Sequence, residues 1–145
     1  MQMKRYSYLI ISLCSVLSTL AANQYVTMGG DDLQDGLSWA TAKSSIKSAI
    51  EAASAGDTVF LAEGVYYQSC TLKEGIHLFG GYSALTGERN IDAYLTILDG
   101  TNLNTMLINQ NSSFSQPTYV DGLVLQNASH TKNGGAVALK GNGVL

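Results

Sequence analysis

The chain has 145 residues and a formal net charge of −3, and 46% of its residues are hydrophobic whereas only 13% are charged. This length suits one domain, and the hydrophobic content argues against wholesale disorder. Few basic residues are present, which argues against a nucleic-acid binder of the basic-patch kind. With only two cysteines, Cys14 and Cys70, a disulfide-rich scaffold is excluded.

The first 22 residues have the pattern of a secretory signal peptide. Lys4 and Arg5 precede an apolar stretch over residues 9–20, and no acidic residue occurs among the 22. Small residues follow and offer cleavage after Ala21 or after Ala22, a choice that the sequence leaves open. The apolar stretch is short for a membrane span, so an uncleaved anchor is the less favoured alternative. We predict an exported protein, extracellular or at the outer-membrane surface, with no integral membrane segment after signal removal.

Removal of the signal leaves one cysteine, Cys70. An intramolecular disulfide is then impossible, and we expect Cys70 to be a small buried residue rather than a reactive thiol. A chain of this size that folds outside the cell without a disulfide needs a continuous apolar core.

Three carboxylates, Asp31, Asp32 and Asp35, fall within five positions. Carboxylate oxygens are ligands that Ca²⁺ prefers. An EF-hand would need an acidic or amide residue and a glutamate at the positions where Leu33 and Ala42 stand, so that motif is rejected. The three residues are a weak calcium candidate, and the alternative is an exposed acidic turn.

Residues 44–53 are predicted to form a helix. Apolar residues recur there with the spacing i, i+3, i+4 and i+7, which is one face of a helix. They are Ile46, Ala49, Ile50 and Ala53. Ser44 or Ser45 can serve as the N-cap, and Gly56 ends the helix. We expect residues 23–57 to form an N-terminal cap region that contains this helix.

From residue 58 onward, short apolar segments alternate with corners rich in glycine and asparagine. The segments are Thr58–Ala62, Ile76–Phe79, Thr96–Leu98, Met106–Ile108, Leu123–Leu125 and Ala136–Leu139. Continuous apolar content is typical of parallel strands that are buried on both faces. The mean spacing of about 20 residues is the scale of one solenoid coil. We therefore predict that residues 58–145 form a partial parallel β-helix, an all-β solenoid truncated after a few coils and capped by the helix.

A series of short motifs also follows the order found in a known family. The motifs are Tyr25-Val26, Asp31-Asp32 with Asp35-Gly36, Ser38-Trp39-Ala40-Thr41-Ala42, Ala55-Gly56-Asp57, Ala62-Glu63-Gly64-Val65-Tyr66, Leu72-Lys73-Glu74-Gly75, Gly80-Gly81-Tyr82, Glu88-Arg89, Thr96-Ile97-Leu98-Asp99-Gly100 and Val120-Asp121-Gly122-Leu123. The series resembles the N-terminal region of exported bacterial right-handed parallel β-helix proteins of the pectin-lyase-like superfamily, in particular the group related to chlamydial polymorphic outer-membrane proteins. The resemblance implies a right-handed β-helix and a fragment of a longer protein, because such proteins usually continue for many more coils.

The superfamily includes polysaccharide lyases and hydrolases, which need clustered carboxylates or a placed Arg or Lys. Arg89 stands beside Glu88 and Asp92, which is typical of a local ion pair in a loop. Asp99 and Asp121 each precede a glycine, which is typical of a turn. The sequence therefore assigns no catalytic residue, no cofactor and no cofactor-binding residue, and no metal ligand beyond the calcium candidate.

Aromatic side chains are the remaining candidates for ligand contact, because they can stack on sugar rings. They are Trp39, Tyr66, Tyr67, Tyr82, Tyr94 and Tyr119. The alternative for Trp39 is packing at the foot of the helix. His77 lies between two apolar residues and is read as a strand residue, and His130 as a loop residue.

Three functions follow from these observations. The leading one is a non-catalytic secreted or cell-surface β-helix scaffold, adhesin-like or binding, with a polysaccharide or a host or cell-surface molecule as partner and no nucleic acid. The second is the N-terminal part of a polysaccharide lyase or hydrolase. The third is a carbohydrate-binding module.

Overall fold

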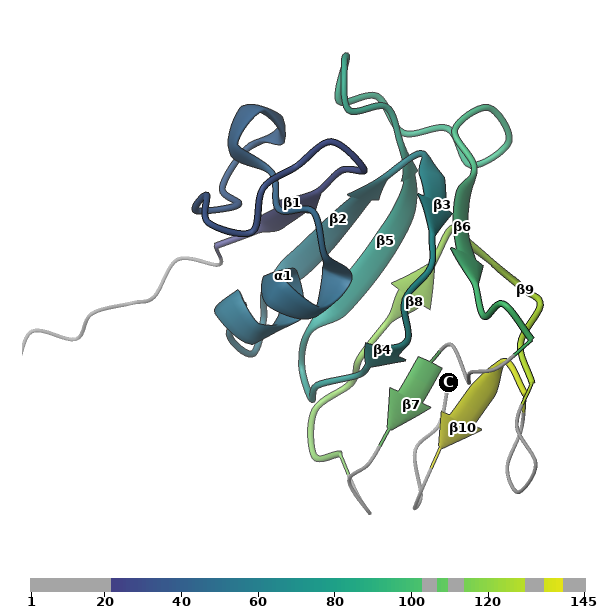
Figure 1. The fold of residues 1–145 in the computed structure, drawn as a ribbon. Helices are drawn as coiled ribbons and strands as arrows, with labels where there is room; N and C mark the ends of the chain where they lie inside the picture. The colour runs from purple at the N-terminus through teal and green to yellow at the C-terminus, as the bar shows by residue number, and fades with distance from the viewer. Residues whose placement is uncertain (1–21, 103–106, 110–113, 130–134, 140–145) are drawn as a thin grey trace, which may run out of the picture.

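The computed structural model describes residues 22–102, 107–109, 114–129 and 135–139 (Figure 1). Its elements follow one another along the chain as β1 (Gln24–Val26), the 3₁₀ helix η1 (Trp39–Thr41), α1 (Ile46–Ala52), β2 (Thr58–Ala62), β3 (Gly64–Tyr66), β4 (Cys70–Thr71), β5 (His77–Tyr82), β6 (Thr96–Asp99), β7 (Leu107–Asn109), β8 (Val120–Asp121), β9 (Leu123–Gln126) and β10 (Val137–Leu139). Residues 1–21 of the predicted signal peptide lie outside the described part of the chain, as do Met106 and His130.

The strands form three small sheets, with the orders β1-β2-β5-β8, β3-β6-β9 and β4-β7-β10. From β2 onward, consecutive strands lie in different sheets, and each strand pairs with the third strand before or after it. All strand pairs of the described residues are parallel, as in the pairing of Thr58 with His77. The predicted parallel pairing is therefore confirmed.

The predicted fold class, an all-β right-handed parallel β-helix with a capping helix, is wrong. The described residues form a mixed α/β structure of one α-helix and small parallel sheets, with no closed or solenoid sheet. Helix α1 also belongs to the core, because Ile46, Ala49 and Ile50 are buried in one cluster with residues of the strands. The spacing of short apolar segments predicts parallel pairing, but it does not determine how the sheets are arranged.

Helix α1 begins and ends close to the predicted bounds of 44–53. Ser45 is the N-cap, and its Oγ accepts a hydrogen bond from the backbone N–H of Ser48 at 3.1 Å. The predicted apolar face is the buried one, and it contacts β1, β2 and β4. Figure 1 shows α1 in front of the strands β1 and β2.

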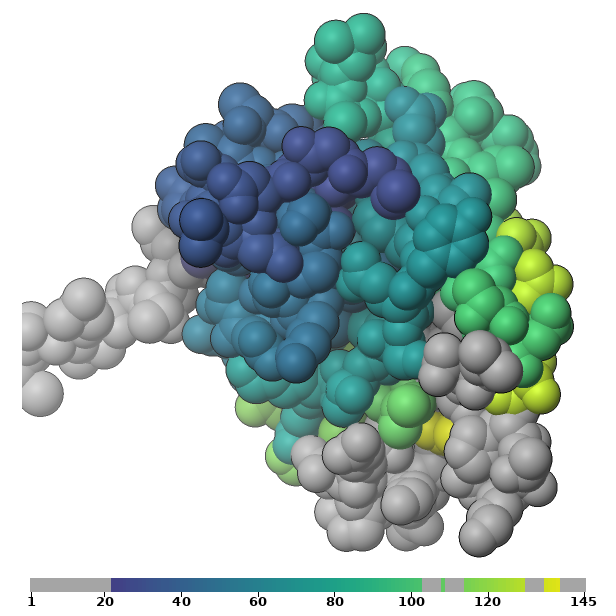
Figure 2. All heavy atoms as spheres, viewed as in Figure 1, coloured from purple at the N-terminus to yellow at the C-terminus, as the bar shows by residue number. Residues whose placement is uncertain are grey.

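The core lies between α1 and the three sheets. Its largest fully buried side chains include Tyr66, Leu61 and Leu78. Cys70 is also fully buried, as predicted, and burial raises the pKa of its thiol to about 12. In the view of Figure 2, the N-terminal described residues, in purple and blue, lie on the left of the molecule, and the yellow C-terminal residues lie on the right.

No helix in the part of the chain that the structure describes is long and apolar enough to cross a membrane.

Candidate functional site

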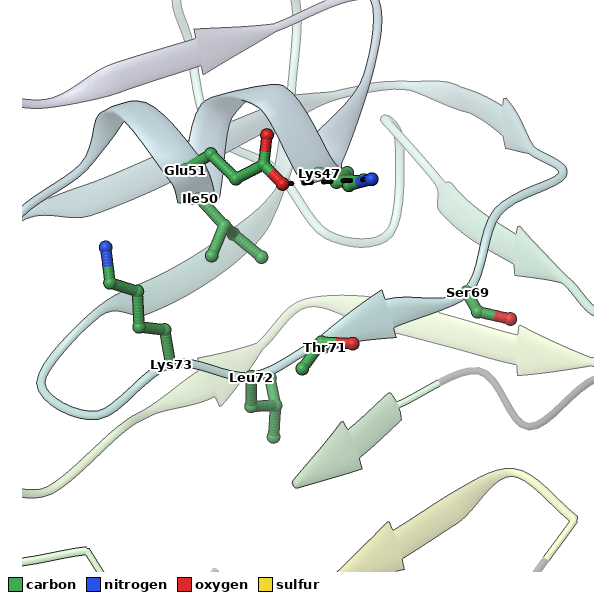
Figure 3. A pocket seen from close by; sticks show the side chains of 7 residues that line it. All are labelled: Lys47, Ile50, Glu51, Ser69, Thr71, Leu72 and Lys73. Atoms are coloured by element: carbon green, nitrogen blue, oxygen red, sulfur yellow. Dashed lines mark ion pairs between the residues drawn. The ribbon is translucent and has the colours of Figure 1, made fainter. Parts of the chain in front are cut away.

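An open hollow of about 410 Å³ lies between α1 and the segment that contains β4; we call it the α1–β4 hollow (Figure 3). Three of its lining residues come from the helix and four from the segment. They are Lys47, Ile50 and Glu51, and Ser69, Thr71, Leu72 and Lys73.

Hydrogen bonds at both ends of α1 hold the segment around β4 in place. Gln68 Oε1 accepts from the backbone N–H of Ile46 at 3.0 Å, at the start of the helix. Lys73 Nζ donates to the carbonyl oxygen of Ala53 at 3.1 Å, at the end of the helix. The hollow therefore lies between α1 and the segment around β4, which are joined by hydrogen bonds at the start and at the end of the helix.

The lining combines an apolar base with polar groups at its edge. Ile50 and Leu72 are each 5% exposed and belong to the core cluster. Strand alternation leaves the neighbouring Thr71 and Lys73 exposed while Leu72 is buried. Figure 3 shows the Ile50 side chain extending from α1 towards the segment with Leu72.

Two amines and one carboxylate set the charge of the hollow. Lys47 Nζ lies 3.8 Å from Glu51 Oε1, and both side chains are well exposed. Because an exposed pair of this kind contributes little to stability, Lys47 can exchange its partner for a ligand at small cost. The Lys73 amine lies at the C-terminal end of the helix, where a positive charge is favourable. The hollow thus carries one excess positive charge and suits an acidic ligand.

The three aspartates of the calcium candidate serve other purposes. Oδ1 of Asp31 and Oδ1 of Asp35 each accept from the backbone N–H two residues later, which makes Asx turns. Asp32 Oδ1 accepts from the backbone N–H groups of Ser44 and Ser45, at 3.0 and 2.9 Å. Burial acts to raise the pKa of Asp32, but hydrogen bonds from Ser45 and its neighbours lower it to about 2.

A lysine amine fills the loop that holds these aspartates. Lys43 is 7% exposed, and its Nζ donates to the carbonyl oxygens of Asp32 at 3.3 Å and Gln34 at 2.7 Å. In the described parts of the chain, no three His, Cys, Asp or Glu side chains are grouped to hold a metal ion. The structure therefore does not bring the three carboxylates together as a calcium site would need.

Arg89 pairs with a residue far away in the sequence rather than with its neighbours Glu88 and Asp92. Its guanidinium donates to Asp121 and, through Nε, to the carbonyl oxygen of Gly80 at 3.0 Å. The hydrogen bond from Arg89 lowers the pKa of Asp121. Sequence reasoning read Asp121 as a turn residue and missed this pair, because the partners meet only through the parallel pairing of β5 and β8.

Asp99 forms a turn, as predicted, and also joins two strands. Its Oδ1 accepts from the backbone N–H of Thr101 at 2.8 Å. Its Oδ2 accepts from the side-chain amides of Gln126 and Asn127, each at 2.8 Å. The carboxylate therefore connects the end of β6 to the end of β9, and these hydrogen bonds lower its pKa.

The aromatic candidates divide into packed and exposed residues. Trp39 packs against Tyr25 and Tyr82, with ring centroids 4.8 and 5.8 Å apart, on the sheet β1-β2-β5-β8 rather than at the foot of the helix. Tyr66 is buried, whereas Tyr67 and Tyr119 are exposed.

His77 lies in β5, as its apolar neighbours predicted. Its Nδ1 accepts from the backbone N–H of Tyr119 at 3.2 Å. The imidazole therefore helps to hold the segment before β8 against β5.

Comparisons of the chain with protein-family models, with curated proteins and with solved structures found no match. The functional interpretation therefore depends on the residues themselves, and the family resemblance stays a hypothesis.

Proposed function

We propose that the chain is a non-catalytic binding scaffold of a secreted or cell-surface protein. Its role would be adhesin-like, in the sense that it binds a ligand and does not change it chemically. The α1–β4 hollow is the observation that carries this proposal. Export is part of the proposal and is supported by the signal-peptide pattern of the first 22 residues.

An acidic saccharide is the ligand that the lining favours. Sugar rings present apolar C–H faces, which can contact Ile50 and Leu72, and hydroxyl groups, which can bond to Thr71 at the edge. The amines of Lys47 and Lys73 can bind a carboxylate through charge-assisted hydrogen bonds. This composition supports a carbohydrate-binding role for the scaffold.

The same lining favours binding over cleavage. A glycoside hydrolase needs two carboxyl groups on opposite sides of the scissile bond. The hollow has one carboxylate, Glu51, and it is paired with Lys47. Among the described lining residues, a ligand held there would meet no second carboxyl group of the kind that this hydrolytic mechanism needs.

Calorimetric titration of the exported chain with an oligouronate, and with the same sugar after reduction of its carboxyl groups, tests the proposal. We expect saturable binding of the oligouronate and much weaker binding of the reduced sugar. In the variant K73M the affinity should fall about tenfold, because a charged donor is lost. No binding of either sugar, or release of shorter sugars, would overturn the proposal.

A pair of variants with equal net charge separates local from general electrostatics. E51Q removes the carboxylate from the hollow, and D92N removes one from the segment between β5 and β6. We expect E51Q to bind the oligouronate more tightly than the unmodified chain and D92N to bind it equally well. Equal gains in both variants would show that net charge alone attracts the ligand and would contradict a site in the hollow.

A further inference from the structure

The buried carboxylate of Asp57 contacts Ala22, the first residue of the described chain. Asp57 is 5% exposed, and its Oδ1 accepts from the backbone N–H of Ala22 at 2.8 Å. Its Oδ2 accepts from the backbone N–H of Ser54, also at 2.8 Å. Neither ion pair of the described residues involves Asp57. A buried carboxylate that has only neutral donors is poorly compensated for its lost hydration.

Strand pairing fixes the position of Ala22 relative to Asp57. Gln24 of β1 pairs with Val59 of β2 in parallel register. Ala22 and Asp57 each lie two residues before this pair, just outside the two strands. The contact between the nitrogen of Ala22 and the carboxylate is therefore set by the edge of the sheet.

We propose that the leader is cleaved between Ala21 and Ala22, and that the new α-ammonium group of Ala22 forms an ion pair with the Asp57 carboxylate. This inference rests on the proposed export. A signal peptidase hydrolyses the peptide bond: water gives its OH to the carbonyl carbon of Ala21 and a hydrogen to the nitrogen of Ala22. The released amine takes up a further proton near neutral pH. A neutral N–H donor to Asp57 thereby becomes a charged one.

The structure thus favours one of the two cleavage points that the sequence left open. Cleavage after Ala22 would remove the residue whose nitrogen reaches Asp57. The sequence of the signal peptide supports the same cleavage point, because signal peptidases prefer small residues at the first and third positions before the cleaved bond. Cleavage after Ala21 places Ala21 and Thr19 there, whereas cleavage after Ala22 places the bulky Leu20 at the third position.

The mass of the exported protein tests the cleavage point. The full chain is expressed with its own leader in a secreting bacterium, and the intact mass and N-terminal peptide of the exported form are measured. We expect a protein that begins at Ala22. A start at Asn23 or elsewhere would overturn this inference but not the proposed export. A chain that keeps its leader and stays in the cell would contradict both.

Thermal unfolding of the exported protein tests the ion pair. The α-amine is acetylated selectively at mildly acidic pH, where lysine amines are more fully protonated. Acetylation keeps an N–H donor but removes the charge, so the Tm should fall by roughly 3–5 °C. In D57N the same modification should leave the Tm almost unchanged. Equal losses in the two proteins would overturn the ion pair.

A second variant keeps Asp57 intact and covers the case in which D57N does not fold. One glycine inserted before Ala22 gives an exported chain whose ammonium group lies one residue beyond Asp57, while the N–H of Ala22 still donates to the carboxylate. We expect this chain to unfold at a lower Tm than the chain that begins at Ala22, and to be insensitive to acetylation. An unchanged Tm, or an equal loss on acetylation, would contradict the pairing.

Discussion

Gly80 lies in β5 at a point where β5, β6 and β9 come close together. A Cβ at this position would meet the carbonyl oxygen of Gly122 and would lie 2.7 Å from Leu123 Cδ2 and 2.9 Å from Thr96 Cβ. Because the backbone at Gly122, between β8 and β9, cannot move aside easily, the absence of a side chain is a packing requirement here.

The variant G80A should therefore lower the free energy of unfolding by about 3 kcal/mol, measured by urea denaturation. G29A is the matched control, because no atom lies within 4 Å of its added Cβ. We expect this control to stay within about 0.5 kcal/mol of the unmodified chain. Similar losses in both variants would contradict the close packing at Gly80.

Asp32 makes a pH-dependent contribution to stability. Its pKa is about 2 in the folded chain against an ordinary value of 3.8, in spite of the opposing effect of burial, because backbone and side-chain donors bond to the ionised form. A lowered folded pKa gives stability that is present above pH 4 and lost as the pH falls towards 2. The variant D32N keeps an oxygen acceptor but carries no charge.

Thermal unfolding between pH 6 and pH 2 should therefore show a steeper fall in Tm for the unmodified chain than for D32N. We expect the two slopes to differ only between pH 4 and pH 2, where Asp32 takes up its proton. Other carboxylates with lowered pKa, such as Asp99 and Asp121, are present in both chains and cancel in the comparison. Parallel curves over this range would contradict the role of Asp32.

At the scale of elements, Asp99 connects β6 to β9 through the amides of Gln126 and Asn127. The variant D99N replaces one of the two acceptor oxygens by an amide group, which cannot accept a hydrogen bond. We expect a loss of about 2 kcal/mol in the free energy of unfolding, because hydrogen bonds to a charged group are lost. D92N makes the same chemical change at an exposed carboxylate whose side chain forms no hydrogen bond among the described residues. A loss in D92N as large as in D99N would contradict the connection.

The sequence predicted those elements that have a periodic or continuous pattern of their own. Helix α1 was predicted because its apolar residues recur with helical spacing, and β2 because five apolar or β-branched residues follow one another. Four strands, β1, β3, β4 and β8, were missed. Each is two or three residues long and lacks the run of three aliphatic residues that indicated β10, which is equally short. So short a segment carries no period, and its extended backbone depends on hydrogen bonds to a partner strand that the local sequence does not show.

The candidate site was beyond the reach of local patterns for a related reason. Lys47 and Lys73 were visible as basic residues, but only the packing of α1 beside β4 places them at one hollow. That packing depends on Gln68, which bonds to the start of the helix from a segment 22 residues later. In the same way Arg89, between β5 and β6, was assigned to its sequence neighbours, whereas its partner Asp121 lies on β8.

At the scale of the whole molecule, the sequence predicted parallel strands correctly and the fold class incorrectly. A spacing of about 20 residues between apolar segments measures the chain length between strands. It does not specify how the sheets are arranged. It also does not show that α1 packs into the core through Ile46 and Ile50. These features are decided by contacts between distant segments, which a single sequence does not display.

Both proposals depend on the same helix. The segment that lines the hollow is hydrogen-bonded to α1 through Gln68 and Lys73. The end of the helix leads to Ser54, which donates to the Asp57 carboxylate, and this carboxylate also accepts from the backbone N–H of Ala22. Ligand binding and N-terminal processing are therefore expected to stabilise the same part of the molecule.

The most direct test of the central claim is an amide NMR titration of the exported, ¹⁵N-labelled chain with an oligouronate, followed by mass analysis of the recovered sugar. We predict saturable shifts confined to the residues around Lys47–Glu51 and Ser69–Lys73, and a sugar of unchanged mass. Saturable shifts elsewhere on the chain, no shifts at all, or recovery of shorter sugars would contradict a non-catalytic binding site in the α1–β4 hollow.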